Sequence, residues 1–159
     1  MKFPRRIYTE SEVKEAKKLA DEGYKYRLRI TGTPDFKRKT KQALRLVKTA
    51  DYYDFLRTYI RSIKEIDGLT QLRQAEATIW TNNYAVENPV DAASIFVQKA
   101  HHMKEYLESK LYYGGAAEKR SNEKRIEFLE TLKMKTREKK VTKECEKLLN
   151  MWRESSLVY

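Results

Sequence analysis

The two histidines of the chain are adjacent, at His101 and His102. On a helix, neighbouring side chains point about 100° apart, so only one of the two can face a given partner, and they do not form a ligand pair. Gln98 lies four residues before His102 and therefore shares its face of a helix. A lone histidine on a helix is more often a partly buried polar residue than a metal ligand. Composition alone therefore does not predict a metal site.

The sequence lacks the common motifs of catalytic and nucleotide-binding sites. The sequence has no G-x-S-x-G element, no Walker loop and no Rossmann glycine string, and the turn at 31–33 has one glycine without the Lys-Ser/Thr of a P-loop. The single cysteine, Cys145, makes neither an internal disulfide nor a cysteine-cluster zinc site. Because it lies on the apolar stripe of an expected helix, we interpret it as a core residue and not as a nucleophile.

The apolar runs, the N-terminal charges and the cysteine content also indicate where the protein is expected in the cell. No apolar run approaches the roughly 18 residues of a membrane span, and the basic N-terminus is followed by charged residues instead of a signal-peptide core. A lone cysteine fits a reducing compartment. We therefore expect no membrane span and a cytoplasmic location.

A mostly helical chain must position these side chains, because five Gly and three Pro in 159 residues are too few turn-forming residues for an all-β fold. Apolar residues at helical spacing predict helices, which end near residues 22, 50, 67, 113 and 133, with a last one over 141–152. Alternating patterns predict strands at 24–30, 70–73 and 77–81. We expect one α+β domain over 1–159, with about six helices, a small sheet of two to four strands, and a C-terminal helical extension at 134–159.

The net charge of +11 is unevenly distributed. Residues 1–50 carry 15 basic and 6 acidic side chains, residues 51–100 carry 5 and 7, and residues 101–159 carry 14 and 10. Such a field attracts nucleic acid or an acidic protein. The densest basic group is a candidate polyanion-binding set: Lys37, Arg38, Lys39 and Lys41. The alternative is that these side chains only solvate a helix face.

One stretch of the chain resembles a known family. Residues 93–102 (Ala-Ser-Ile-Phe-Val-Gln-Lys-Ala-His-His), followed after a Gly-Gly break by 117–122 (Ala-Glu-Lys-Arg-Ser-Asn), resemble the active-site segment of small gluzincin-type zinc metallopeptidase domains. Those domains have an apolar lead-in, an H-E-x-x-H helix, and a downstream helix with a Glu and often an Asn one turn later. The turn and helix from 31 also look like the front of such domains. The resemblance covers about residues 24–130 and implies a metallopeptidase-like fold.

The resemblance also implies roles for individual residues. The metal-ligand positions read Gln98, His102 and Glu118, with Asn122 one turn further on, and the general-base position reads Lys99. An amide oxygen binds zinc far more weakly than imidazole, and a lysine cation accepts no proton. No catalytic residue and no cofactor are therefore expected, and His102 and Glu118 are at most weak zinc ligands. Gln98, His102, Glu118 and Asn122 form a candidate polar cluster, and a Glu118 carboxylate beside His102 would raise its pKa.

Three functional interpretations follow. The first is a non-catalytic metallopeptidase-like domain that acts by binding, as a scaffold or regulator, with an acidic protein or nucleic acid as its partner. The second is a small basic nucleic-acid-binding protein without that kinship. The third is a self-associating structural protein that uses Tyr52–Tyr53 or Tyr112–Tyr113 as its interface. In all three, the pairing of His102 with Glu118 could also be an ordinary interhelix contact.

Overall fold

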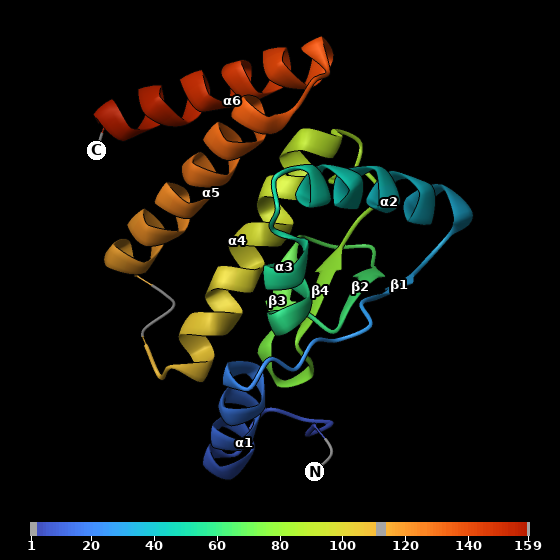
Figure 1. Ribbon diagram of the computed structural model, residues 1–159, viewed down its shortest axis with the longest axis vertical. Coiled ribbons are helices and arrows are strands. Elements are labelled where there is room, and N and C mark those ends of the chain that lie inside the picture. The colour runs from blue at the N-terminus through green and yellow to red at the C-terminus, as the bar shows by residue number, and fades with distance from the viewer. Residues whose placement is uncertain (1–2, 111–113, 159) are drawn as a thin grey trace.

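The computed structural model describes residues 3–110 and 114–158. In this part of the chain, six α-helices and a four-stranded sheet make an α+β fold (Figure 1). The helices are α1 (Glu10–Asp21), α2 (Pro34–Thr49), α3 (Tyr53–Tyr59), α4 (Pro89–Leu107), α5 (Gly115–Lys135) and α6 (Lys139–Val158). The strands are β1 (Arg29–Thr31), β2 (Ser62–Glu65), β3 (Gln71–Arg73) and β4 (Thr78–Thr81), with a short 3₁₀ turn at Gln74–Glu76.

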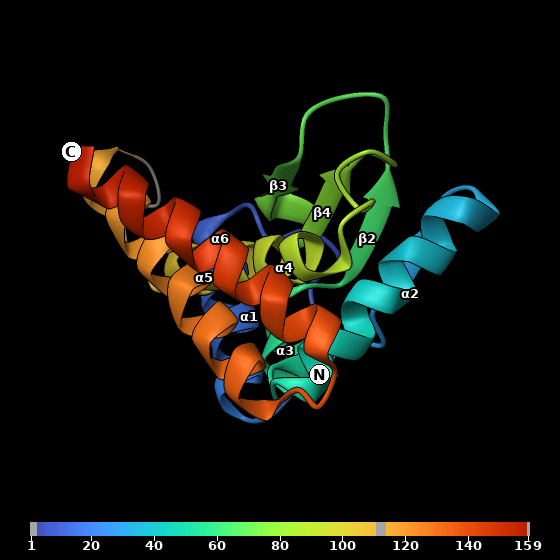
Figure 2. The same cartoon turned by 90° about the horizontal axis from the view of Figure 1, so that it is seen from above.

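The sheet has the strand order β1-β2-β4-β3, with β1, β2 and β4 parallel and β3 antiparallel at the edge. Its middle row of paired residues, Ile30, Ile63, Ile79 and Leu72, faces the helices. Figure 2 shows the sheet at one side of the molecule, with α4 beneath it and the other helices below and beside it. One continuous core cluster runs from Ile7 to Leu149.

Local signals start the two helices that position the candidate residues. The Thr33 hydroxyl accepts the Phe36 N–H at the start of α2, and Pro34 occupies a first-turn position where its missing N–H costs nothing. At α4, the Asn88 side chain accepts the N–H groups of the next residues, Val90 and Asp91, around Pro89. Both starts depend only on residues that are neighbours in the sequence.

The helix expected up to residue 67 is wrong in its second half. The chain leaves the helical conformation at Ile60, and β2 begins two residues later as the strand between β1 and β4. Ile60 and Ile63 are three apart, which fits a helical stripe, but both are fully buried where the chain passes into the sheet. A four-residue strand with one buried apolar side chain is too short for its period to be recognised.

Two other boundaries differ from expectation. The strand expected at 24–30 is confirmed only near its end, because Leu28 has φ 53°, a left-handed conformation that interrupts extended pairing. The helix expected over 90–113 ends at Leu107, with Ser109 at φ 59°, and residues 111–113 lie outside the described part of the chain. The strands expected near 70–73 and 77–81 are confirmed as β3 and β4.

The C-terminal part folds back onto the rest of the molecule. Helix α6 lies along α5 (Figure 1), and its buried side chains Val141, Cys145, Leu148 and Leu149 belong to the common core. Burial raises the pKa of the Cys145 thiol to about 11, which fits the expected core role. Among the described helices, none combines the length and the hydrophobicity required to cross a bilayer.

Candidate functional site

Helices α4 and α5 pack side by side, and a row of polar side chains joins them. The Gln98 amide donates a hydrogen bond of 2.5 Å to the Ser121 hydroxyl on α5. Two turns toward the C-terminus of α4, Glu105 pairs with Arg120 at 2.9 Å. The sequence-predicted Gln98 does reach α5, but its partner is Ser121, the residue next to the expected Asn122.

The same helix pair holds a buried guanidinium. Arg125 on α5 donates to the Asp91 carboxylate at 2.6 Å and to the buried Ser94 hydroxyl at 3.2 Å, and its guanidinium lies 4.5 Å from the centre of the Trp152 ring. Burial lowers the pKa of Arg125 and the Asp91 charge opposes that shift. Sequence inspection missed this residue, although an Arg between apolar residues on the inner stripe of a helix was a usable signal.

His102 and Glu118 differ from the expected arrangement. Glu118 is exposed in the first turn of α5, whereas His102 is partly buried on α4. The pKa of His102 is lowered and not raised, first by burial and then by the charge of Lys99, with Arg120 acting in the same direction and Glu105 against it. A raised pKa was expected only for a Glu118 carboxylate beside His102, and Glu118 is not among the charged groups that act on this imidazole. The charges acting on this imidazole come from α4 itself and from Arg120.

The neighbouring polar residues on α4 are also in partly apolar surroundings. Burial lowers the pKa of Lys99, and the nearby charge of Arg125 adds to that effect. The His101 ring lies 4.5 Å from the ring of Phe55, and burial, together with the charges of Lys124 and Lys104, lowers its pKa to about 4. These effects favour the neutral form of both imidazoles.

A zinc ion does not fit this donor set. The Gln98 amide oxygen is a neutral, weak zinc donor, Glu118 is exposed, and cationic Lys99 acts on the remaining imidazole of His102 and repels a divalent ion. Among residues 3–110 and 114–158, no three His, Cys, Asp or Glu side chains come together closely enough to hold a metal. The chemistry that α4 and α5 offer is hydrogen bonding and charge pairing.

The candidate polyanion set on α2 is split by the structure. Arg38 pairs with Asp35 at 2.8 Å, and Lys39, whose side chain is only 12% exposed, pairs with Asp35 at 3.0 Å and with Glu87 at 2.5 Å. Lys37 and Lys41 are exposed, and neither has an ion pair within the described residues. The surface that α2 offers to a polyanion is therefore smaller than four adjacent cations suggest.

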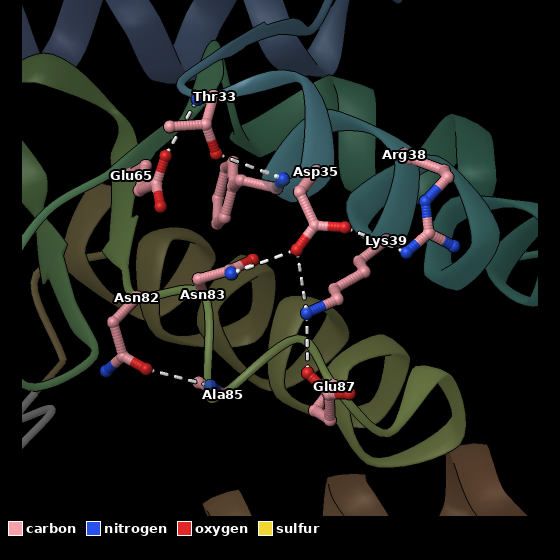
Figure 3. Close-up of polar contacts among 10 residues, drawn as sticks. Thr33, Asp35, Arg38, Lys39, Glu65, Asn82, Asn83, Ala85 and Glu87 are labelled. Atoms are coloured by element: carbon pink, nitrogen blue, oxygen red, sulfur yellow. Dashed lines mark hydrogen bonds and ion pairs between the residues drawn. The ribbon is translucent and has the colours of Figure 1, made fainter.

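The carboxyl ends of the parallel strands meet beside the start of α2, where a polar network links the loop before α2, the end of β2 and the loop after β4 (Figure 3). The Glu65 carboxylate accepts the Thr33 N–H at 2.8 Å, and Asn83 donates to Asp35 at 3.1 Å. Hydrogen bonds, of which that from Arg38 has the largest effect, hold the pKa of Asp35 well below its usual range.

These contacts give the network a structural role. Crevices at this edge often bind ligands in open parallel sheets. Here the Asp35 and Glu65 carboxylates are bound by neighbouring groups of the network, while the Asn83 Oδ1 is buried without a hydrogen-bond partner among the described residues. Asp35 and Asn83 are 48 residues apart in sequence, so the spacing of residues could not reveal the contact. The network attaches the loop after β4 to α2.

A hollow of about 410 Å³ lies between α2, the start of α4 and the start of α6. Its lining carries two cations, Arg45 and Lys140, and two carboxylates, Glu138 and Glu144. Arg45 lies 3.5 Å from Glu138, and Asn88 donates to Glu144 at 2.7 Å. The balance of charge gives this hollow no preference for an anion or a cation.

The aromatic residues considered for self-association are in part packed inside the monomer. The Tyr52 ring meets Phe128 edge-on at 5.3 Å, and Tyr53 lies beneath the Lys48 ammonium at 4.5 Å. Tyr112 and Tyr113 lie outside the described residues. Self-association through these residues stays a prediction.

Strand pairing assembles one surface that the sequence did not indicate. Arg29, Lys64, Arg73 and Trp80 come from four different strands and lie on the sheet face opposite the isoleucine row. None of these residues belongs to a recognisable motif in its own segment, and only the pairing register of the four strands brings them together. The usable signal was the polar or basic residue on either side of each strand's central apolar residue.

Comparison with known proteins found no match. No family model, no curated protein and no solved structure matches this chain.

Proposed function

We propose that this chain is a non-catalytic, metallopeptidase-like domain that acts by binding, as a scaffold or regulator. The observation that carries the proposal is the hydrogen bond from Gln98 to Ser121. The position that corresponds to the first zinc-binding imidazole of such domains is used here to join two helices.

The residue after Gln98 supports the same conclusion. A metallopeptidase needs a carboxylate there to take a proton from the metal-bound water. Lys99 cannot do this while it carries its own proton, and its charge opposes a metal ion beside His102. Loss of a general base alone lowers a rate by about a hundredfold or more. The segment therefore keeps the length and order of an active-site helix without its reactive groups.

A binding role is favoured by the charge of the chain, +11 in 159 residues. An acidic protein and a nucleic acid are the partner classes with the complementary charge. The polar row between α4 and α5 would then serve to hold the two helices in register while the surface makes the contacts.

Elemental analysis and a peptidase assay test the loss of catalysis. Purified protein is incubated with zinc, passed through a desalting column and analysed, in parallel with the variants His102→Ala and His101→Ala. We expect substoichiometric zinc in all three proteins and no cleavage of a denatured protein substrate. One zinc per chain, together with cleavage that is abolished by His102→Ala and kept by His101→Ala, would overturn the proposal.

A further inference from the structure

The sheet presents one face without a helix over it. Paired residues on neighbouring strands share a face, so two rows lie opposite the buried isoleucines and define the outer sheet face: Arg29, Ser62, Thr78 and Arg73, then Thr31, Lys64, Trp80 and Gln71. In Figure 2, none of the described helices lies over this face. The side chains at its margins are exposed, including Arg29, Lys64 and Arg73.

The charge of the outer sheet face has one sign. Its eight residues include three cations and no carboxylate, and the nearest acidic strand residue, Glu65, lies in another row and binds the Thr33 backbone. Within the described residues, none of the three cations takes part in an ion pair, in contrast to Arg38 and Lys39 on α2. These cations therefore remain available to an anionic ligand.

An aromatic ring lies among these cations. The Arg73 guanidinium carbon is 4.4 Å from the centre of the Trp80 ring, and the Lys64 ammonium is 5.6 Å from it. Both cations are thus held at the ring by cation–π attraction. A planar base can stack on an indole or on a guanidinium plane, while phosphates pair with the cations around it.

We propose that the outer sheet face binds single-stranded nucleic acid, with Arg29, Lys64 and Arg73 on the phosphates and Trp80 with Arg73 as the base-stacking platform. A single strand fits better than a duplex because its bases are free to stack on a flat sheet. An acidic protein would satisfy the cations but makes no use of the half-exposed Trp80 indole with the Arg73 guanidinium beside it. The inference rests on the proposal that the protein acts by binding. It concerns the sheet and not the α4–α5 helix pair. A zinc-loaded, active protein would therefore overturn the non-catalytic assignment of that helix pair without bearing on the sheet.

Fluorescence anisotropy of a labelled oligothymidylate, titrated with the full chain at several salt concentrations, tests the proposal. Three phosphate contacts predict that the logarithm of the affinity falls with the logarithm of the salt concentration with a slope of about −2. A weaker interaction is expected with the corresponding duplex. No association at low salt, or preference for the duplex, would overturn the proposal.

Two double variants locate the surface. Lys64→Ala/Arg73→Ala removes two exposed cations from the outer sheet face, and Lys37→Ala/Lys41→Ala removes two exposed cations from α2, so both change the net charge equally. We expect the sheet variant to lose about tenfold or more in affinity and to reduce the magnitude of the salt slope by about 1.4, whereas the α2 variant changes little. An equal or larger loss in the α2 variant would place binding on that helix and contradict the proposal.

The fluorescence of Trp80 tests stacking without removing the ring. The chain has two tryptophans, so Trp152→Phe leaves Trp80 as the only reporter, and circular dichroism verifies that this variant is folded. We expect quenching that follows oligothymidylate binding and that is absent with heparin, a polyanion without bases. Binding at saturation without quenching, or displacement of the oligonucleotide by equal concentrations of polyglutamate, would show a general anion surface and overturn the stacking assignment.

Discussion

Arg125 on α5 and Asp91 on α4 form a partly buried ion pair at 2.6 Å, with side-chain exposures of 11% and 34%. The Ser94 hydroxyl and the Trp152 ring occupy further sides of the guanidinium. The pair therefore connects α4, α5 and α6 at one point, and it lies on the same contact between helices as the Gln98–Ser121 hydrogen bond.

Removal of the Asp91 carboxylate should destabilise the fold strongly. Asp91→Ala leaves the Arg125 guanidinium without its charge partner in a site where water reaches it poorly, and such losses are about 3–5 kcal/mol for fully buried pairs. Because Asp91 is one-third exposed, we expect about 2 kcal/mol in urea unfolding. Glu146→Ala is the control, since it removes an exposed pair with Lys133 that also joins α5 to α6, and it should change the free energy of unfolding by less than about 0.5 kcal/mol. Equal effects of the two variants would contradict the importance of burial.

The Gln98–Ser121 hydrogen bond should appear as a coupling energy. The single variants Gln98→Ala and Ser121→Ala and their double variant form a cycle that isolates the interaction. We expect a coupling of about 1 kcal/mol, because the bond links a buried Ser121 hydroxyl to a half-buried Gln98 side chain between α4 and α5. Chemical denaturation of the four proteins measures it. A coupling near zero would mean that the two side chains do not depend on one another in solution.

Acid should weaken the fold through His101. Its pKa is lowered to about 4 in the folded chain, below the ordinary value of 6.5, so the unfolded chain binds more protons between these values. Stability is therefore complete above about pH 6.5 and decreases as the pH falls toward 4. We expect a loss on the order of 2 kcal/mol, less than the full shift implies, because the ring is only partly buried.

Urea unfolding of the parent protein and of His101→Gln between these pH values measures the effect. The variant cannot gain a proton at this position, so its stability should depend less steeply on pH. An unchanged pH dependence would assign the acid sensitivity to other groups, of which His102, with its own lowered pKa, is the first to test.

Sequence inspection could predict the elements that have strong local signals. Thr33-Pro34 and Asn88-Pro89 begin α2 and α4 by capping chemistry that depends only on neighbouring residues. Strand β2 was missed because a central strand derives its stability from β1 and β4, which lie 31 and 13 residues away at their closest ends in the chain, and not from its own four residues. The local pattern at Ile60 and Ile63 satisfies a helix equally well.

The candidate site was predicted to a smaller extent, for the same reason. Spacing places Gln98 and His102 on one helix face, but it cannot give the rotation of α5, which brings Ser121 and Arg125 toward α4 and leaves Glu118 exposed. The outer sheet face was not predicted, because the alternation within each strand does not give the register of the four strands that sets Arg73 and Lys64 beside Trp80.

Gly32 should tolerate no side chain, because the chain passes very close to its neighbours there. A Cβ at this position would lie 2.7 Å from the Glu65 Cβ and 2.8 Å from the Phe36 ring, at the point where Glu65 accepts the Thr33 N–H. We expect Gly32→Ala to destabilise the protein by about 1–3 kcal/mol in thermal or urea unfolding, as overpacking usually does.

The matched control for Gly32→Ala is Gly115→Ala, at the first residue of α5, where a Cβ would have nothing within 4 Å. Alanine has the higher helix propensity, so this variant should be neutral or more stable by up to about 1 kcal/mol. Hydrogen exchange adds a local readout: Gly32→Ala should speed exchange at the Thr33 amide, while Gly115→Ala leaves it unchanged. If Gly32→Ala proved as stable as the parent, Glu65 and Phe36 would have to move apart freely, and the tight junction between β1, β2 and α2 would not exist in solution.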